Sequence, residues 1–287
     1  MLAEQEHTFI LLLAMGFYVV ASGSYLRALI VKSQRIDSFG NSMLLLAVIC
    51  HALDLGLHLA GSDQYSLYNR MIMVSFMMIF VSIGYLVMQQ RYKLNFMGSY
   101  YVLPTFILFL ATFAYQLSSG IHLNQILLNN QSDSFIHNHL RNLHQIRNIH
   151  SALSVLAISF FNLSFINSVL YLMMESRLKN KIWDFWFERL PALNTLEDMG
   201  HQSTLLGFLC LTLSILSGAF YHSRTGQTFL HIGLREWMIF LAWLVYVIYF
   251  HIRFSIGALG KKLAYIAIGC YILQIVAIFL MIGIHKF

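Results

Sequence analysis

The chain contains eight apolar runs, each about 20 residues long, and this pattern restricts it to a fold that crosses a membrane. A helix needs about 20 residues to cross a hydrocarbon core of about 30 Å. Hydrophobic residues make up 58% of the 287 residues and charged residues only 10%, which excludes an ordinary soluble domain. We therefore predict an all-α, polytopic integral membrane protein with one membrane domain over residues 1–287. The predicted spans are Phe9–Val31, Ser42–Ala60, Met71–Met88, Tyr100–Leu117, His150–Met174, Gln202–Tyr221, Glu236–Phe254 and Leu263–Ile284.

Basic residues gather on alternate links between these runs. Twelve of the 18 Lys and Arg residues lie in or beside the links after the first, third, fifth and seventh spans: Arg27, Lys32, Arg35, Arg91, Lys93, Arg177, Lys179, Lys181, Arg189, Arg253, Lys261 and Lys262. The positive-inside rule places these links in the cytoplasm and both termini on the outer, periplasmic side. The net charge of +6 therefore reflects orientation in membrane lipid, and no nucleic-acid partner is expected. Glu4 and Glu6, with no basic residue near them, favour a retained first span over a signal peptide.

Two of the links are long enough for their composition to predict local structure. Residues 118–149 form a histidine-rich outer loop, predicted to end in a short amphipathic helix that leads into the fifth span. Residues 176–200 form an inner interfacial segment in which Trp183, Trp186 and Phe187 stand among charges. This composition predicts a helix lying at the headgroups and a break at Pro191.

Few residues other than histidine suggest a chemical role. Cys50, Cys210 and Cys270 lie singly in apolar runs without a CxxCH motif, so neither covalent haem attachment nor a disulfide framework is indicated. The sequence contains no phosphate-binding loop, HExxH or nucleophile motif, which favours a carrier or assembly factor over an enzyme. Ser214 and Gly218 are spaced i, i+4 and predict close packing between helices.

The 13 histidines are distributed unevenly across the predicted membrane. Those in or beside outer segments, or at outer ends of spans, are His7, His58, His122, His137, His139, His144, His150, His222, His231 and His285. The other three lie deeper or at the inner boundary: His51 within the second span, and His201 and His251 near the inner ends of the sixth and seventh spans.

His51, Asp54 and His58 share one face of the second span, because they are spaced i, i+3, i+7. A carboxylate at membrane depth costs on the order of 2.5 to 3.5 kcal/mol, so we expect Asp54 to face the bundle interior. There it can hydrogen-bond a histidine ring and fix the nitrogen that remains for ligation. The alternative is a buried polar pair that only joins helices.

The remaining candidate histidines lie at the two membrane boundaries. His150 opens the fifth span and His285 closes the eighth, both on the outer side, and two neutral histidines on facing helices can hold one haem iron. Surface histidines that bind water or headgroups are the alternative. His201 and His251 can share an inner site, or can simply mark helix ends.

Five segments carry a family resemblance. They are HSALSVLAISFFNLSFINSVLYLMM (150–174), LEDMGHQSTLLGFLCLTLSILSGAFY (196–221), WLVYVIYFHIRF (243–254), GKKLAYIAIGCYILQIVAIFL (260–280) and GIHKF (283–287). These segments resemble the cytochrome c assembly membrane protein family, the haem-handling Ccs/Ccm group. The whole chain is similar to its shorter YpjD-like and HemX-like members.

The resemblance implies that haem b is bound non-covalently by histidines. It implies that His150 and His285 are axial ligands at the outer face, and that His251 is the histidine within the membrane, associated with haem entering from the inner side. Its partner is not implied, and His51 and His201 are our candidates. The predicted haem-binding set is therefore His150, His285, His251, His51, His201, Asp54 and His58.

One feature of the family is missing. The tryptophan-rich outer loop with its WxWD core has no counterpart here, since the link between Tyr221 and Trp237 reads HSRTGQTFLHIGLRE. This leaves haem binding as an expectation and gives no support for delivery of haem to an apocytochrome.

The leading hypothesis is a multi-pass protein of the bacterial inner membrane that binds haem and moves or senses it during cytochrome c assembly. Other cytochrome c maturation or haem-pathway proteins are its expected partners. The alternative is an accessory or regulatory protein of the same fold that acts by contacting a partner and no longer delivers haem. A third reading, a quinol-linked b-type redox enzyme, requires paired histidines at both membrane depths.

Overall fold

The computed structural model describes residues 2–60, 70–118, 137–224, 234–257 and 260–284. Over these ranges the chain is built of helices without strands, which confirms the all-α, polytopic prediction. The helices are α1 (Leu2–Val31), α2 (Gln34–Ala60), α3 (Arg70–Tyr92), α4 (Gly98–Ser118), α6 (His137–Lys179), α7 (Leu193–Arg224), α8 (Leu234–Ile256) and α9 (Lys261–Ile284).

Each predicted span lies within one of these helices. Among the described residues, seven helices, α1 to α4 and α6 to α8, are long and apolar enough to cross a bilayer. The longest, α6, begins at His137, well before the predicted start of the fifth span, so the short amphipathic helix expected there is its first part. Its 43 residues correspond to about 65 Å, roughly twice the hydrocarbon thickness. Helix α6 therefore extends beyond the bilayer.

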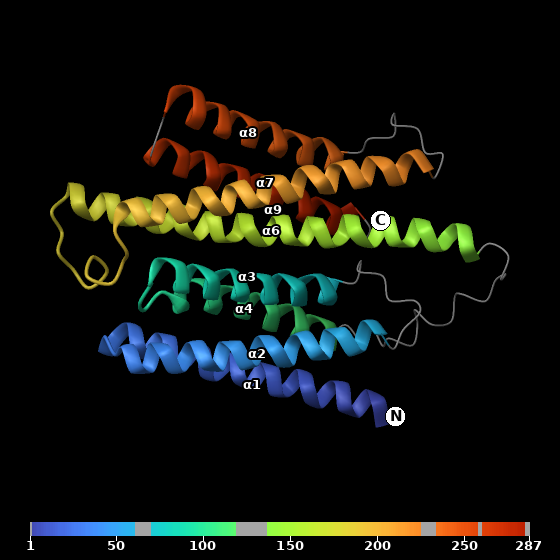
Figure 1. Ribbon diagram of the computed structural model, residues 1–287, viewed down its shortest axis with the longest axis horizontal. Coiled ribbons are helices and arrows are strands. Elements are labelled where there is room, and N and C mark those ends of the chain that lie inside the picture. The colour runs from blue at the N-terminus through green and yellow to red at the C-terminus, as the bar shows by residue number, and fades with distance from the viewer. Residues whose placement is uncertain (1, 61–69, 119–136, 225–233, 258–259, 285–287) are drawn as a thin grey trace.

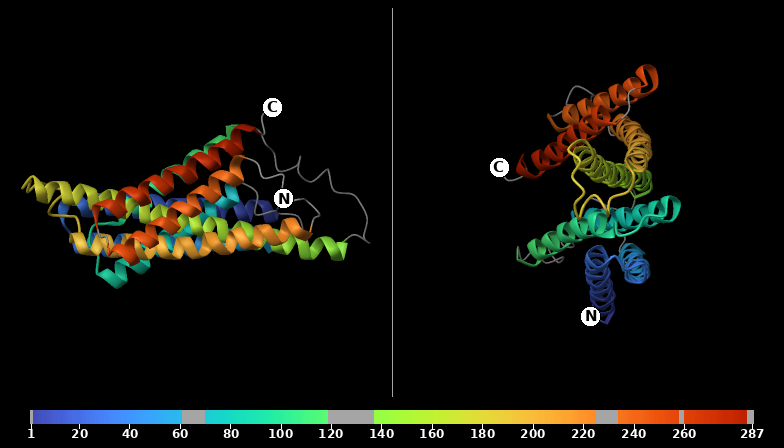
Figure 2. Two further views of the ribbon diagram at one scale, coloured as in Figure 1. Left: turned by 90° about the horizontal axis from the view of Figure 1, so that it is seen from above. Right: turned by 90° about the vertical axis from the view of Figure 1, so that its left-hand side faces the viewer.

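The helices form two groups that meet along α3 and α6. Helices α1 to α4 pack mainly on one another, and α6 packs on α7 and α9, while α8 packs on α9. Figure 1 shows the groups lying side by side, and the right-hand view of Figure 2 looks along the helices from one end. That view shows the helices stacked from α1 and α2 at one edge to α8 at the other.

The basic links all lie at one end of the bundle. The links α1–α2, α3–α4, α6–α7 and α8–α9 are at the left of Figure 1, while α1 begins and α9 ends toward the other end. Three of these links leave a helix through a lysine in the left-handed region, Lys32 (φ 56°), Lys93 (φ 51°) and Lys181 (φ 51°). The predicted alternation is confirmed. The assignment of this end to the cytoplasm stays a prediction.

Buried tyrosines occupy the centre of the N-terminal group and reach α6. Tyr25, Tyr85 and Tyr101 are fully buried, and their rings contact one another in series with centroids 5.7 and 5.3 Å apart. At one end, Tyr25 donates to Asn41 Oδ1 over 2.9 Å. At the other, Tyr101 donates to Asn167 Oδ1, which joins α4 to α6. A polar contact thus crosses the boundary between the two groups.

The inner link between α6 and α7 differs from the predicted interfacial helix. Helix α6 continues to Lys179, residues 185–189 form hydrogen-bonded turns, and α7 begins at Leu193. Asp184 determines this shape, because its carboxylate accepts both the Arg177 Nε–H (2.9 Å) and the Phe187 backbone N–H (3.1 Å). The prediction of a helix was wrong because this local pairing of Asp184 closes the link into turns.

The same link crosses to the other helix group. Arg189 Nε donates to the Leu29 carbonyl over 2.6 Å, and a second nitrogen of its guanidinium donates to the Ile30 carbonyl over 3.2 Å. These carbonyls are at the C-terminal end of α1, where helical partners run out. Lys32 also pairs with Glu188 of the link. The link therefore connects the C-terminal end of α1 to the group formed by α6 to α9.

Candidate functional site

His150 lies in the slot between α6 and α7. Its Nδ1 is 2.8 Å from the Ser214 carbonyl oxygen. A carbonyl can only accept a hydrogen bond, so Nδ1 carries a proton, and when the ring is neutral Nε2 carries the lone pair. Histidines that bind metals commonly donate their other ring N–H to a backbone carbonyl in this way. The tautomer of His150 thus suits ligation through Nε2.

Small residues of α7 make room for the His150 ring. A Cβ atom added at Gly218 would lie 3.0 Å from two atoms of the ring, and Ser214 Oγ lies 3.2 Å from Nδ1. Ser154, one turn along α6 from His150, shares a 2.6 Å hydrogen bond with the Ser214 hydroxyl. The close packing predicted from the i, i+4 pair Ser214 and Gly218 is confirmed. Sequence reasoning missed that the residue packed there is His150.

Two of the predicted ligand residues cannot be compared with this geometry. His285 follows the end of α9 and lies outside the described residues. The backbone of His58 belongs to α2, but its side chain lies outside the described part. The pairing of His150 with His285 and the role of His58 stay predictions.

His51 is buried between α1, α2 and α4. Its side chain is 1% exposed, and its ring meets Tyr18 and Phe109 edge-on, with centroids 5.8 and 5.1 Å apart. Nδ1 lies 3.5 Å from the Tyr18 hydroxyl, and Nε2 has no hydrogen-bond partner among the described residues. The described contacts of the His51 ring are with Tyr18 and Phe109, and the expected hydrogen bond between Asp54 and a histidine ring of this helix face stays a prediction.

His201 and His251 lie on neighbouring helices, α7 and α8, toward the end of the bundle that carries the basic links (Figure 1). The His201 ring packs among Tyr249, Phe250 and Phe254 of α8, with centroids 5.9 to 6.2 Å away, and its Nδ1 is 3.4 Å from the Tyr249 hydroxyl. His251 is exposed, and its Nδ1 lies 3.2 Å from Ser255 Oγ. The described contacts thus bring His251 to neither His201 nor His51, and the inner pairing stays a prediction.

A small polar cavity adjoins His201. It is about 20 Å³, enough for about one water molecule. Its lining includes Glu197 and Tyr249, and Glu197 pairs with Arg253 at 3.1 Å. Over the ranges that the structure describes, no group of three or more His, Cys, Asp or Glu side chains could hold a metal ion. A haem iron held between two histidines requires no such group.

Comparison with known proteins decides the family. The sequence profile of the family described as Cytochrome C assembly protein matches residues 9–285, nearly the whole chain. The chain belongs to this cytochrome c assembly protein family. The match includes every helix that holds a candidate histidine, together with His285. No solved structure matches the chain.

Individual relatives of this cytochrome c assembly protein match over shorter stretches. Protein HemX of Bacillus subtilis (strain 168) is 28% identical over 139 residues, which is 48% of this chain and 50% of HemX. Cytochrome c biogenesis protein CcsA of Prochlorococcus marinus is 33% identical over 96 residues in strain MIT 9312, and equally so in strain AS9601. Each of these two matches spans 32% of this chain and 31% of the CcsA protein. The chain therefore spans about a third to a half of the length of the curated relatives that it matches.

Proposed function

We propose that this protein binds haem b non-covalently in the bacterial inner membrane and takes part in cytochrome c assembly. The family places the chain among cytochrome c assembly proteins, and the relatives named CcsA are cytochrome c biogenesis proteins. The observation that carries the proposal is the hydrogen bond from His150 Nδ1 to the Ser214 carbonyl. It fixes the orientation of the ring, and a neutral histidine that donates from Nδ1 binds a metal through Nε2.

The described residues would supply one histidine ligand to such a group. His150 holds its ring in the slot formed by Ser214 and Gly218, and His285 is the proposed second ligand. Bound haem would supply a redox-active iron. The protein's own part is to fix the orientation of the His150 ring through α7.

His51 is the candidate for a second, deeper position. Its ring is buried in the N-terminal group and its Nε2 has no partner within the described chain, although buried polar atoms are normally hydrogen-bonded. The proposal is limited to haem binding, because the link after Tyr221 has no tryptophan-rich core that would support delivery to an apocytochrome.

The absorption spectrum of the purified, haem-supplemented protein tests this proposal. We expect a Soret band that shifts on reduction, and His150→Ala should weaken haem binding by at least about tenfold because the iron loses a ligand. His222→Ala, at the end of α7, is the matched control and should leave the band unchanged. A wild-type protein without a Soret band would rule the proposal out.

A second candidate is an accessory protein of the same fold that acts by contacting a partner. The α6–α7 link favours this candidate, because it presents a large aromatic side chain, Trp183, that is 68% exposed. The two candidates differ in the yield of mature cytochrome c in cells. A yield that survives His150→Ala but falls with Trp183→Ala favours the accessory role, and the reverse favours haem handling.

A further inference from the structure

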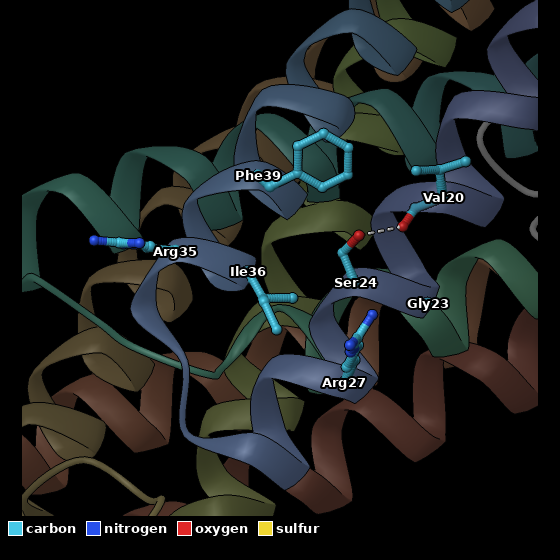
Figure 3. A pocket seen from close by; sticks show the side chains of 7 residues that line it. All are labelled: Val20, Gly23, Ser24, Arg27, Arg35, Ile36 and Phe39. Carbon is cyan, nitrogen blue, oxygen red and sulfur yellow. Dashed lines mark hydrogen bonds between the residues drawn. The ribbon is translucent and has the colours of Figure 1, made fainter.

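An open groove lies between α1 and α2 at the end of the bundle that carries the basic links. Its volume is about 410 Å³, and Figure 3 shows its lining side chains. Arg27 of α1 and Arg35 of α2 line it together with apolar Val20, Ile36 and Phe39. From Val20 to Arg27 the groove follows α1 for about 10 Å. The groove therefore combines two cationic side chains with an apolar surface, and it runs parallel to the axis of α1.

The two arginines of the groove differ from the other arginines at this end of the bundle. Arg177, Arg189 and Arg253 pair with Asp184, Glu188 and Glu197, at 2.9, 3.6 and 3.1 Å. The Arg91 guanidinium lies over the Tyr92 ring, 5.7 Å from its centroid. Neither groove arginine contacts an acid, a carbonyl oxygen or an aromatic ring anywhere in the described residues.

We propose that this groove binds one anionic phospholipid. Arginine presents a planar fork of donors that matches a phosphate, and an exposed guanidinium at the bilayer boundary meets headgroup phosphates. The apolar residues of the groove suit the start of an acyl chain. The anionic leaflet facing the basic links of a membrane protein supplies such lipids.

Gly23 gives a way to fill the groove without disturbing the fold. It lines the groove, and a Cβ atom added there would meet nothing within 4 Å. Gly16 of the same helix is equally open and lies two turns away, but it is not part of the groove. Leucine at these two positions therefore compares a filled groove with an unfilled one.

Native mass spectrometry of the full chain, equilibrated in detergent with phosphatidylglycerol or phosphatidylcholine, measures the retained lipid. The wild type should retain phosphatidylglycerol preferentially. The double variant Arg27→Gln/Arg35→Gln should lower this preference on the order of 30-fold, from about fivefold per basic side chain. Gly23→Leu should also lower retention, and Gly16→Leu should not.

Two further measurements separate the contributions of the guanidinium fork and of the acyl chain to lipid retention. Arg27→Lys/Arg35→Lys keeps the charge and should restore only part of the retention, because the fork is lost. Glycerol phosphate should compete weakly, since it lacks the acyl chain. Equal retention of the two lipids by the wild type would overturn the proposal. So would equal competition by glycerol phosphate, or unchanged retention in both the double glutamine variant and Gly23→Leu.

Discussion

His150 depends on a glycine of the neighbouring helix for the space that its ring occupies. A side chain at Gly218 would lie against two atoms of that ring, and the ring would then lose its hydrogen bond to the Ser214 carbonyl. The position of the proposed ligand is therefore set by α7 as much as by α6. The i, i+4 pair of small residues predicted close packing, but the register that brings His150 there follows from the packed helices and is not visible in the sequence.

Gly218→Leu tests this dependence without removing the ligand. We expect the variant to fold and to lose haem affinity by about tenfold or more, as when a residue that orients a metal ligand is lost. The measurement is a haem titration followed at the Soret band. Gly269→Leu serves as the control, because a Cβ there meets nothing within 4 Å. Equal affinities in the wild type and Gly218→Leu would show that the slot does not orient the ligand.

Asp184 lies outside the membrane-spanning helices, and its ionised carboxylate stabilises the turns of the α6–α7 link by accepting hydrogen bonds from Arg177 and Phe187. The hydrogen bond from Arg177 is the main cause that lowers the pKa of this carboxyl below its usual value of 3.8. A lowered pKa in the folded state stabilises the link above the usual pKa, and this stabilisation is lost as the pH falls through the folded value. The pairing is thus fully present at neutral pH.

Hydrogen–deuterium exchange of peptides from residues 180–192 provides the test. In the wild type, protection should fall as the pH is lowered below about 4, the usual range of an aspartate carboxyl. Asp184→Asn should show lower protection already at pH 6 and a smaller dependence on pH. A wild type and a variant with parallel profiles would contradict this role of Asp184.

The link between α6 and α7 shows where sequence patterns stop being informative at the level of an element. Hydropathy predicted the spans well, because the bilayer requires each apolar run to form a helix that satisfies its own backbone. The link lies beyond the membrane-spanning helices, where backbone groups can bind other partners and a helix is not required. Aromatic and charged residues there are typical of an interfacial helix. The structure has turns instead, because Asp184 pairs with Arg177 and Phe187 nearby in the chain and Arg189 bonds to the distant end of α1.

Arg189→Ala should weaken the attachment of the link to α1. Its side chain is 8% exposed and donates to two carbonyls at the end of α1. The loss should lower the free energy of unfolding by about 2 kcal/mol, the usual size for buried hydrogen bonds to a charged group. Thermal unfolding in detergent measures it. Lys179→Ala, an exposed basic residue at the end of α6, should have little effect, and equal midpoints for the two variants would argue against a fastening role.

At the scale of the whole molecule, the two helix groups share a polar contact inside an apolar boundary. Tyr101 donates to Asn167 where α4 and α6 face each other, and both side chains are fully buried. A buried donor without its acceptor is costly, so the pair favours one register between the groups. Neither residue stands out in the sequence, because each is one polar position in a long apolar run.

A double-mutant cycle on this pair tests the register. Asn167→Val should destabilise the protein by about 1 to 3 kcal/mol, because the Tyr101 hydroxyl is left unpaired. Adding Tyr101→Phe should recover part of this loss, which gives a coupling energy of about 1 kcal/mol. Unfolding midpoints in detergent supply the four values. Additive effects of the two substitutions would mean that the contact contributes nothing specific.

The hydrogen bonds of Arg189 also bear on the order in which the protein is made. The carbonyl of Leu29 receives its donor from a residue 160 positions later in the chain. As synthesis proceeds from the N-terminus, α1 is made early, while its final backbone partner is translated only after α6. The C-terminal end of α1 therefore gains its last hydrogen-bond donor only after α6 has been made. In a chain that stops before residue 189, the carbonyls of Leu29 and Ile30 lack the Arg189 donor.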